Sequence, residues 1–186
     1  MKNIFFTADT HFGHNAIRRF CDRPFDTVKK MDEALIQNWN ALIRPRDTVY
    51  HLGDFSYKAA DDLHCYLKRL NGKIHLVLGN HDNHNLRVDC GSLKSVNDLL
   101  TVNIDGQRIT LCHYAMRVWP ASHRGSWHLY GHSHGKLPDD PNSLSIDVGV
   151  DCHDYFPIPF DRVKELMAEK TWIPPFGNEG VDDSGD

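Results

Sequence analysis

The stretch IFFTADTH (residues 4–11) places a short apolar segment directly before Asp9, Thr10 and His11. A run of four to eight apolar residues bounded by turn-forming residues is typical of a buried β-strand. The stretch therefore predicts a strand over Ile4–Ala8 whose end carries a carboxylate and an imidazole. In α/β folds, the carboxyl ends of the strands form the edge at which ligands bind.

The same arrangement recurs at four other places along the chain. Each time a short apolar segment is followed by Asp, Asn or His, and three times a glycine stands between them. The segments are Thr48–Leu52 before Gly53-Asp54, Lys73–Leu78 before Gly79-Asn80-His81-Asp82, Gln107–Cys112 before His113, and Trp127–Tyr130 before Gly131-His132-Ser133-His134. A glycine permits a tight turn and lets the backbone approach a metal or phosphate closely. We expect these polar residues to gather at one edge of the fold.

Helical periodicity separates the early strands. Apolar residues three or four apart predict helices over Val28–Ile43 and Ala59–Leu70, with Asp26 or Thr27 as the N-cap of the first, and a last helix over Phe160–Lys170. The alternation of strands and helices predicts an α/β beginning.

The second half of the chain is expected to be richer in strands. Asp105-Gly106 stands between Thr101–Ile104 and Gln107–Cys112, which is a hairpin signal, and Ser145–Val150 predicts a further strand. Part of this half should therefore be antiparallel.

Length and composition exclude several classes of protein. The 186 residues suit one domain, which we assign to residues 1–176, with a disordered acidic tail over 177–186. A net charge of -4 provides no general basic field for nucleic acid. No apolar run approaches the roughly 18 residues of a membrane span, and the first apolar stretch is too short for a signal peptide. The five cysteines are widely spaced and odd in number, which indicates reduced thiols in a cytoplasmic protein.

The donor types at the strand ends indicate a metal site. Carboxylates, imidazoles and one amide oxygen form a mixed set that suits Mn²⁺, Fe²⁺, Ni²⁺ or Zn²⁺. Two adjacent divalent ions would bring four positive charges, of which Asp9 and Asp54 would cancel only two. Such a site stays positive and attracts hydroxide and phosphate.

The ordered blocks D-x-H, GD, GNHD, H and GH-x-H resemble the calcineurin-like metallophosphoesterase superfamily. They run from Asp9 to His134, and TADTHFGHNAI (residues 7–17) is similar to a branch of small bacterial and phage phosphoesterases. The resemblance implies a four-layer α/β/β/α sandwich of two mixed β-sheets flanked by helices, with the metal site at the carboxyl ends of the strands.

The resemblance also implies a role for each block. It assigns a first metal to Asp9, His11 and His134, a bridging position to Asp54, and a second metal to Asn80, His113 and His132. His81 stands beside the substrate as a proton donor, and Asp82 orients it. The implied activity is that of a phosphoric ester hydrolase, in which a hydroxide bridging two divalent metals, with manganese as the first choice, attacks a phosphodiester and, as an extension, a monoester.

Several alternatives stay open. The run Phe55–Lys58 after Asp54 lacks the Asp-Arg pair of protein phosphatases, so we expect a small phosphate ester, nucleotide-like in character, rather than a phosphoprotein, nucleic acid or membrane. The other class of function is a non-catalytic metal-binding scaffold or protein-interaction module with the same fold. The completeness of the blocks favours an enzyme, and a single closed structural metal site would not need so many ligands.

Some polar residues near the blocks have two interpretations. His14 is a candidate substrate contact, with a supporting hydrogen bond as the equal alternative. His51 is assigned a structural role within its strand. Arg117, His123 and Arg124 are candidates for a phosphate clamp, with a solvated loop as the favoured alternative.

Overall fold

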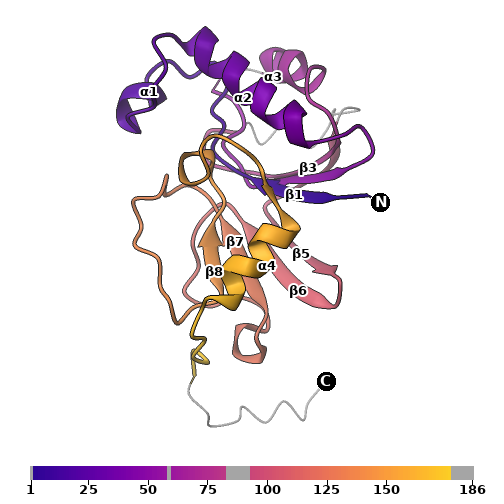
Figure 1. Cartoon of the computed structure of the whole chain (residues 1–186), viewed down its shortest axis with the longest axis vertical. Coiled ribbons are helices and arrows are strands. Elements are labelled where there is room, and N and C mark those ends of the chain that lie inside the picture. The colour runs from indigo at the N-terminus through magenta and orange to yellow at the C-terminus, as the bar shows by residue number, and fades with distance from the viewer. Residues whose placement is uncertain (1, 58–59, 83–92, 177–186) are drawn as a thin grey trace.

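Two mixed β-sheets form the centre of the molecule, as the computed structural model shows (Figure 1). The structure describes residues 2–57, 60–82 and 93–176. The first sheet has the strand order β4-β3-β2-β1-β9, and the second has the order β5-β6-β7-β8. The expected α/β class with two mixed sheets and flanking helices is confirmed.

The strands of the first sheet are parallel except for the last. They are β1 (Ile4–Thr7), β2 (Thr48–His51), β3 (Lys73–Val77), β4 (Leu93–Asn97) and β9 (Ile158–Pro159). β9 pairs antiparallel with β1. The second sheet contains β5 (Leu99–Ile104), β6 (Gln107–Cys112), β7 (Trp127–Tyr130) and β8 (Ser145–Asp147), of which only β5 and β6 are antiparallel neighbours.

The helices are α1 (Ile17–Phe20), α2 (Val28–Leu42), α3 (Ala60–Leu67) and α4 (Phe160–Ala168). Short 3₁₀ turns occur at Ser122–Arg124 and Val150–Cys152. α2 begins where the sequence predicts, because the Thr27 side chain accepts a hydrogen bond of 3.1 Å from the backbone N–H of Lys30. No helix among the described residues has the length and apolarity that crossing a membrane requires.

Alternation along β1 connects two separate cores. Phe5 belongs to a cluster that includes Trp39 of α2, whereas Phe6 faces the other way, into a cluster that the two sheets share. The ring of Phe6 also lies 6.4 Å from that of Phe160 at the start of α4. Because both of its faces are buried, β1 can hold the residues that follow it in a fixed place.

The hairpin prediction is confirmed. Asp105 (φ 52°) and Gly106 (φ 84°) both adopt left-handed backbone, and Ile104 pairs with Gln107 across them. Two successive left-handed residues suit the twist of a two-residue hairpin.

Three short elements were not predicted, and one strand ends three residues earlier than expected. α1, β4 and β9 have at most five residues each, too few for a clear period. The strand expected over Ser145–Val150 ends at Asp147, because Gly149 pairs with Ala8 and the Val150 N–H donates to the Ala8 carbonyl. The chain therefore crosses there from the second sheet to the first.

The single domain over residues 1–176 stays a prediction, and the tail at 177–186 lies outside the described residues.

Candidate metal centre

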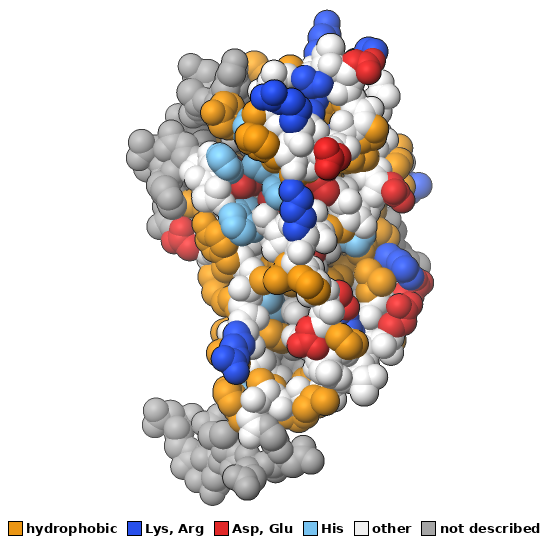
Figure 2. Space-filling view, turned by 90° about the vertical axis from the view of Figure 1, so that its left-hand side faces the viewer, with side chains coloured by type: hydrophobic (Ala, Val, Ile, Leu, Met, Phe, Trp, Pro, Cys, Tyr) orange, Lys and Arg blue, Asp and Glu red, His pale blue; other side chains and the backbone are white. Residues whose placement is uncertain are grey.

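The polar residues of the five blocks meet where the ends of strands from both sheets come together. Asp9 and His11 follow β1, and Asp54 follows β2; the remaining ligand candidates follow β3, β6 and β7. Figure 2 shows histidine side chains gathered on one face of the molecule, with basic and hydrophobic side chains beside them. The site is therefore open to solvent on this face.

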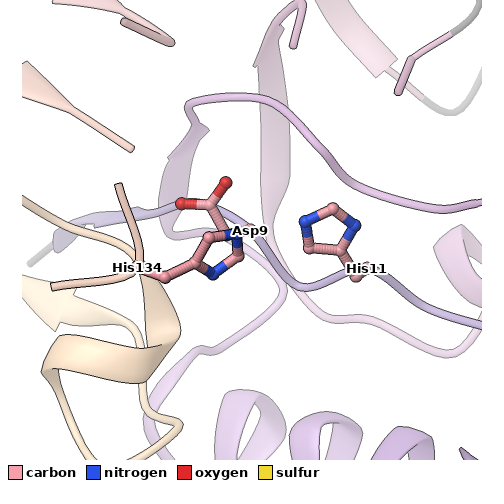
Figure 3. Close-up of side chains that lie close together, drawn as sticks. All are labelled: Asp9, His11 and His134. Carbon is pink, nitrogen blue, oxygen red and sulfur yellow. The ribbon is translucent and has the colours of Figure 1, made fainter. Parts of the chain in front are cut away.

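Asp9, His11 and His134 form a first group. One donor atom from each lies within 4.8 Å of the others, and Figure 3 shows the three side chains next to one another. Asp9 and His11 come from one loop, whereas His134 comes from a distant part of the chain. This is the set that the sequence assigns to a first metal.

Asp54, His113 and His132 form a second group with the same spacing. Asn80 belongs to it through its side-chain oxygen, which lies 3.1 Å from Nε2 of His113. His113 is buried and His132 is exposed, so the group reaches from the interior to the surface.

Asp54 lies between the two groups. Its Oδ2 atom is 3.4 Å from Nε2 of His11 and 3.5 Å from Nε2 of His113. One carboxylate oxygen is thus shared between the two sets of candidate ligands.

Five of the candidate ligands adopt left-handed backbone, which is uncommon for residues other than glycine. They are Asp9, His11, Asp54, His132 and His134, with φ between 48° and 68°. Such residues cost on the order of 1–3 kcal/mol each and persist where the surroundings impose them. This backbone conformation directs the side chains at the strand ends toward one another.

Gly53 shows why the turns must be so tight. Its φ is 94°, and a Cβ atom there would lie 2.6 Å from both the Gly79 nitrogen and Nδ1 of His113. A side chain at this position would separate the loops that carry Asp54 and Asn80.

Burial has the largest effect on the pKa values of Asp9 and His11 in the first group. Burial raises the pKa of Asp9 well above its usual range; the charge of His134 opposes this, and those of Asp147 and Asp54 add to it. Burial lowers the pKa of His11, and the cation of Arg23 adds to that effect. Among the described residues, Oδ1 of Asp9 and Nε2 of His11 are buried without a hydrogen-bond partner. A divalent cation would satisfy both atoms, so these residues fit a metal.

Two residues that the sequence did not single out support His134. Asp151 Oδ2 lies 2.7 Å from Nδ1 of His134 and accepts a second bond from the Arg23 guanidinium. Burial alone would lower the pKa of His134, but its hydrogen bonds to Asp151 and Cys21 and the charge of Asp9 raise that pKa to about 10.

Arg23 extends this support to the first loop. Its guanidinium donates to the backbone carbonyls of Asp9 (2.6 Å) and Thr10 (3.1 Å) as well as to Asp151. Arg23 is only 4% exposed, so these bonds replace water almost completely. No local pattern marks either residue, because 128 positions separate them.

His81 and Asp82 are placed differently from one another. His81 is exposed, its ring centroid is 5.2 Å from that of His11, and its backbone N–H donates to Oδ1 of Asp54. Asp82 is buried, and its carboxylate accepts three hydrogen bonds, from the backbone N–H groups of Asp54, Phe55 and Gly79. These bonds join two loops, and the described hydrogen bonds of Asp82 include none to the His81 ring, so the expected orientation of His81 by Asp82 stays a prediction.

The other histidines fall into two kinds. His14 lies at the site: its Nδ1 is 3.3 Å from Nδ1 of His11, and its ring stacks on Tyr57. His51 is fully buried with its Nε2 atom 3.0 Å from the Thr10 hydroxyl, and burial, together with the charge of His113, lowers its pKa to about 3. This environment agrees with the structural role expected for His51.

Two of the candidate clamp residues, Arg117 and His123, contact the C-terminal part of the described chain. Arg117 lines a separate cavity of about 630 Å³ together with Trp172 and Phe176. The ring of His123 lies 6.0 Å from that of Phe176. These contacts favour the alternative of a loop outside the site.

The chain is similar to known proteins in both sequence and fold. The calcineurin-like phosphoesterase superfamily domain matches residues 1–146. An uncharacterized protein of Methanocaldococcus jannaschii is 32% identical, with 91% of this chain and 93% of that protein covered. The gene 66 protein of Mycobacterium phage D29 is 28% identical, with 91% of this chain and 98% of the phage protein covered. A protein of unknown function from Aquifex aeolicus has the same fold, with a TM-score of 0.69 at 24% identity over 89% of this chain and all of that one.

The three hydrogen bonds of Asp82 predict a role in stability. We expect Asp82→Asn to lower the free energy of unfolding by about 2–4 kcal/mol, because bonds to a charged group contribute roughly 1.5–3 kcal/mol each and an amide cannot accept all three. Urea denaturation measures the change, with Asp26→Asn on an exposed residue as the control. Unchanged stability of Asp82→Asn would contradict the role in joining the loops.

Comparison of a buried with an exposed ion pair tests how much the Arg23–Asp151 pair contributes to stability. Both Arg23–Asp151 and Arg69–Glu33 are bidentate, but the first is buried and the second is exposed. We expect Asp151→Ala to destabilise the protein by about 3–5 kcal/mol, because it leaves a buried cation unpaired. Glu33→Ala should have little effect in the same thermal denaturation, since exposed pairs contribute little. Equal losses in the two variants would contradict this interpretation.

Proposed function

The chain belongs to the calcineurin-like phosphoesterase superfamily, and on this basis we propose that it is a metal-dependent phosphoesterase that hydrolyses a phosphodiester bond. The observation that carries the proposal is the position of Asp54. Its Oδ2 atom lies 3.4 Å and 3.5 Å from histidine nitrogens of two different ligand groups. One oxygen shared in this way is what two neighbouring cations require.

In this proposal the two groups hold two divalent ions. Asp9, His11 and His134 take the first, Asn80, His113 and His132 take the second, and Asp54 contacts both. When bound, such ions supply a hydroxide at neutral pH and neutralise the charge on the phosphoryl oxygens. Manganese is our first choice, and iron, nickel and zinc suit the same donors.

The side chains around the ligands complete the chemistry. Asp151 accepts the Nδ1 proton of His134, so Nε2 is the remaining ligand atom of that ring. His81 is exposed beside His11 and is proposed to give a proton to the leaving oxygen. The adjacent His14 is proposed to contact the substrate.

The alternative function is a non-catalytic scaffold with the same fold. Such a protein would not need an intact set of donors in strained backbone together with an exposed proton donor.

The odd number of widely spaced cysteines keeps the cytoplasm as the proposed location.

Metal dependence is the first test of the proposal. Metal-stripped protein is titrated with Mn²⁺, Ni²⁺ or Zn²⁺ and assayed on bis-p-nitrophenyl phosphate and p-nitrophenyl phosphate. We expect metal-dependent hydrolysis with the diester preferred. Asp54→Asn should lower kcat/KM at least about 100-fold and reduce the metal content, because a ligand to both ions is lost. Asp105→Asn, in the exposed hairpin turn, is the matched control.

The outcomes of this assay separate the two functions. Two metals bound per chain with neither ester hydrolysed would favour the scaffold. Full activity of Asp54→Asn would exclude the proposed centre. Faster hydrolysis of the monoester than of the diester would indicate that the substrates are phosphomonoesters.

Proton donation by His81 predicts a dependence on the leaving group. We expect His81→Ala to lower kcat about 10²–10⁴-fold for an alkyl diester, whose alkoxide needs a proton, and much less for a p-nitrophenyl ester. Metal content should be unchanged, as it should be in the His64→Ala control on α3. An equal loss on both esters would argue against proton donation.

A further inference from the structure

Two exposed tyrosines stand directly beside the histidines of the candidate metal centre. Tyr57 is 51% exposed and Tyr114 is 46% exposed. Neither belongs to a sequence block, and neither has a role in the proposed chemistry. Large aromatic side chains that remain exposed beside a hydrolytic site require an explanation in terms of what contacts them.

Tyr57 is held as a flat surface on the His11 side of the site. Its ring stacks on that of His14, with the centroids 3.9 Å apart and the planes at 2°. Its backbone N–H donates to the carbonyl of Phe12, which lies in the same loop as His11. One face of the ring therefore rests on the protein, and the exposed remainder of the side chain is available to a ligand.

Tyr114 occupies the corresponding place on the His113 side. Its ring centroid lies 5.0 Å from that of His113 and 4.8 Å from that of His132, in edge-on arrangements. The turn that carries it is anchored, because the backbone N–H of Met116 donates to the buried His128. Tyr114 is therefore positioned before any ligand arrives, which limits the entropy lost on binding.

Asp54 separates the two tyrosines. His11, next to the His14–Tyr57 stack, and His113, next to Tyr114, each approach the same Asp54 oxygen. A phosphorus atom held at this centre has one tyrosine on each flank. A phosphodiester has an organic group on each side, whereas a monoester has only one.

The geometry points to Tyr57 and Tyr114 as stacking platforms for planar substituents on the two sides of a scissile phosphodiester. The chemical class is a short nucleotide diester, in which a base stacks on either ring; this rests on the function proposed above. Base–aromatic stacking tolerates any base, because each has a π-face. The net charge of -4 favours one or two nucleotides over a long nucleic acid.

Two esters with the same leaving group test the effect of a nucleoside. Thymidine 5′-(p-nitrophenyl phosphate) and methyl p-nitrophenyl phosphate carry a nucleoside and a methyl group, respectively, on the other side of the phosphorus, and the tyrosine variants then show how much of any difference comes from stacking. We expect the native protein to prefer the thymidine ester by about tenfold in kcat/KM, within the range that stacking supplies. Thymine would stack on one tyrosine and the p-nitrophenyl group of either ester on the other. Leucine at the tyrosine that holds the thymine, in Tyr57→Leu or in Tyr114→Leu, should therefore remove most of this preference. Tyr57→Phe and Tyr114→Phe should retain it, because phenylalanine also stacks.

Trp172→Leu is the control, since Trp172 is also exposed but lines the separate cavity with Arg117. Its preference for the thymidine ester should equal that of the native protein. An undiminished preference in both tyrosine-to-leucine variants would overturn the proposal, as would a native protein that hydrolyses the two esters equally well.

A binding measurement keeps the stacking proposal separate from the proposed activity. The Zn²⁺-loaded protein is titrated with dithymidine phosphorothioate, whose sulfur slows hydrolysis, while NMR follows the tyrosine ring protons. We expect the Tyr57 and Tyr114 signals to shift while that of the buried Tyr130 stays in place. Such shifts would support the platforms even if neither ester were hydrolysed. Failure to hydrolyse the esters would contradict only the proposed activity. Absence of binding, or binding without these shifts, would overturn the platforms.

Discussion

Two buried carboxylates, Asp9 and Asp54, impose the constraint on which the site depends. Removing Asp9 from water raises its pKa, and the nearby charge of Asp54 adds to the effect. A charge in such a place is stable only when positive groups or hydrogen-bond donors surround it. The concentration of histidines at the ends of β1, β2, β3, β6 and β7 meets part of that requirement. A cation would meet the rest, because Oδ1 of Asp9 is buried without a hydrogen-bond partner among the described residues.

The backbone meets this requirement through strain and through long-range hydrogen bonds. Left-handed turns at Asp9 and Asp54 aim the carboxylates inward, and the Gly53 turn lets the loops touch. Asp82 then ties the Asp54 loop to the Gly79 loop by accepting their amides. These contacts hold donors from separate strands in one arrangement before a ligand binds, which is the preorganisation that electrostatic catalysis needs.

Around this rigid centre, the proposed chemistry divides among side chains of different exposure. Buried ligands such as His11 and His113 define where charge is held, and Arg23 with Asp151 fixes the ring of His134 from behind. In the proposed chemistry, exposed groups such as His81 and the two flanking tyrosines contact the substrate. Because this face is open, it leaves room for an organic group on each side of a bound phosphodiester.

The sequence by itself determined the features that depend on neighbours in the chain. The apolar run before Asp9, the Thr27 cap and the Asp105-Gly106 hairpin are local, so each was predicted at its position. The ordered blocks likewise indicated which donors to expect together. Only the tertiary structure decided the partners of Asp82 and the pairing of Arg23 with Asp151, residues 128 positions apart. Such contacts form when two sheets pack and bring distant loops together, and no short-range pattern records which loops will meet.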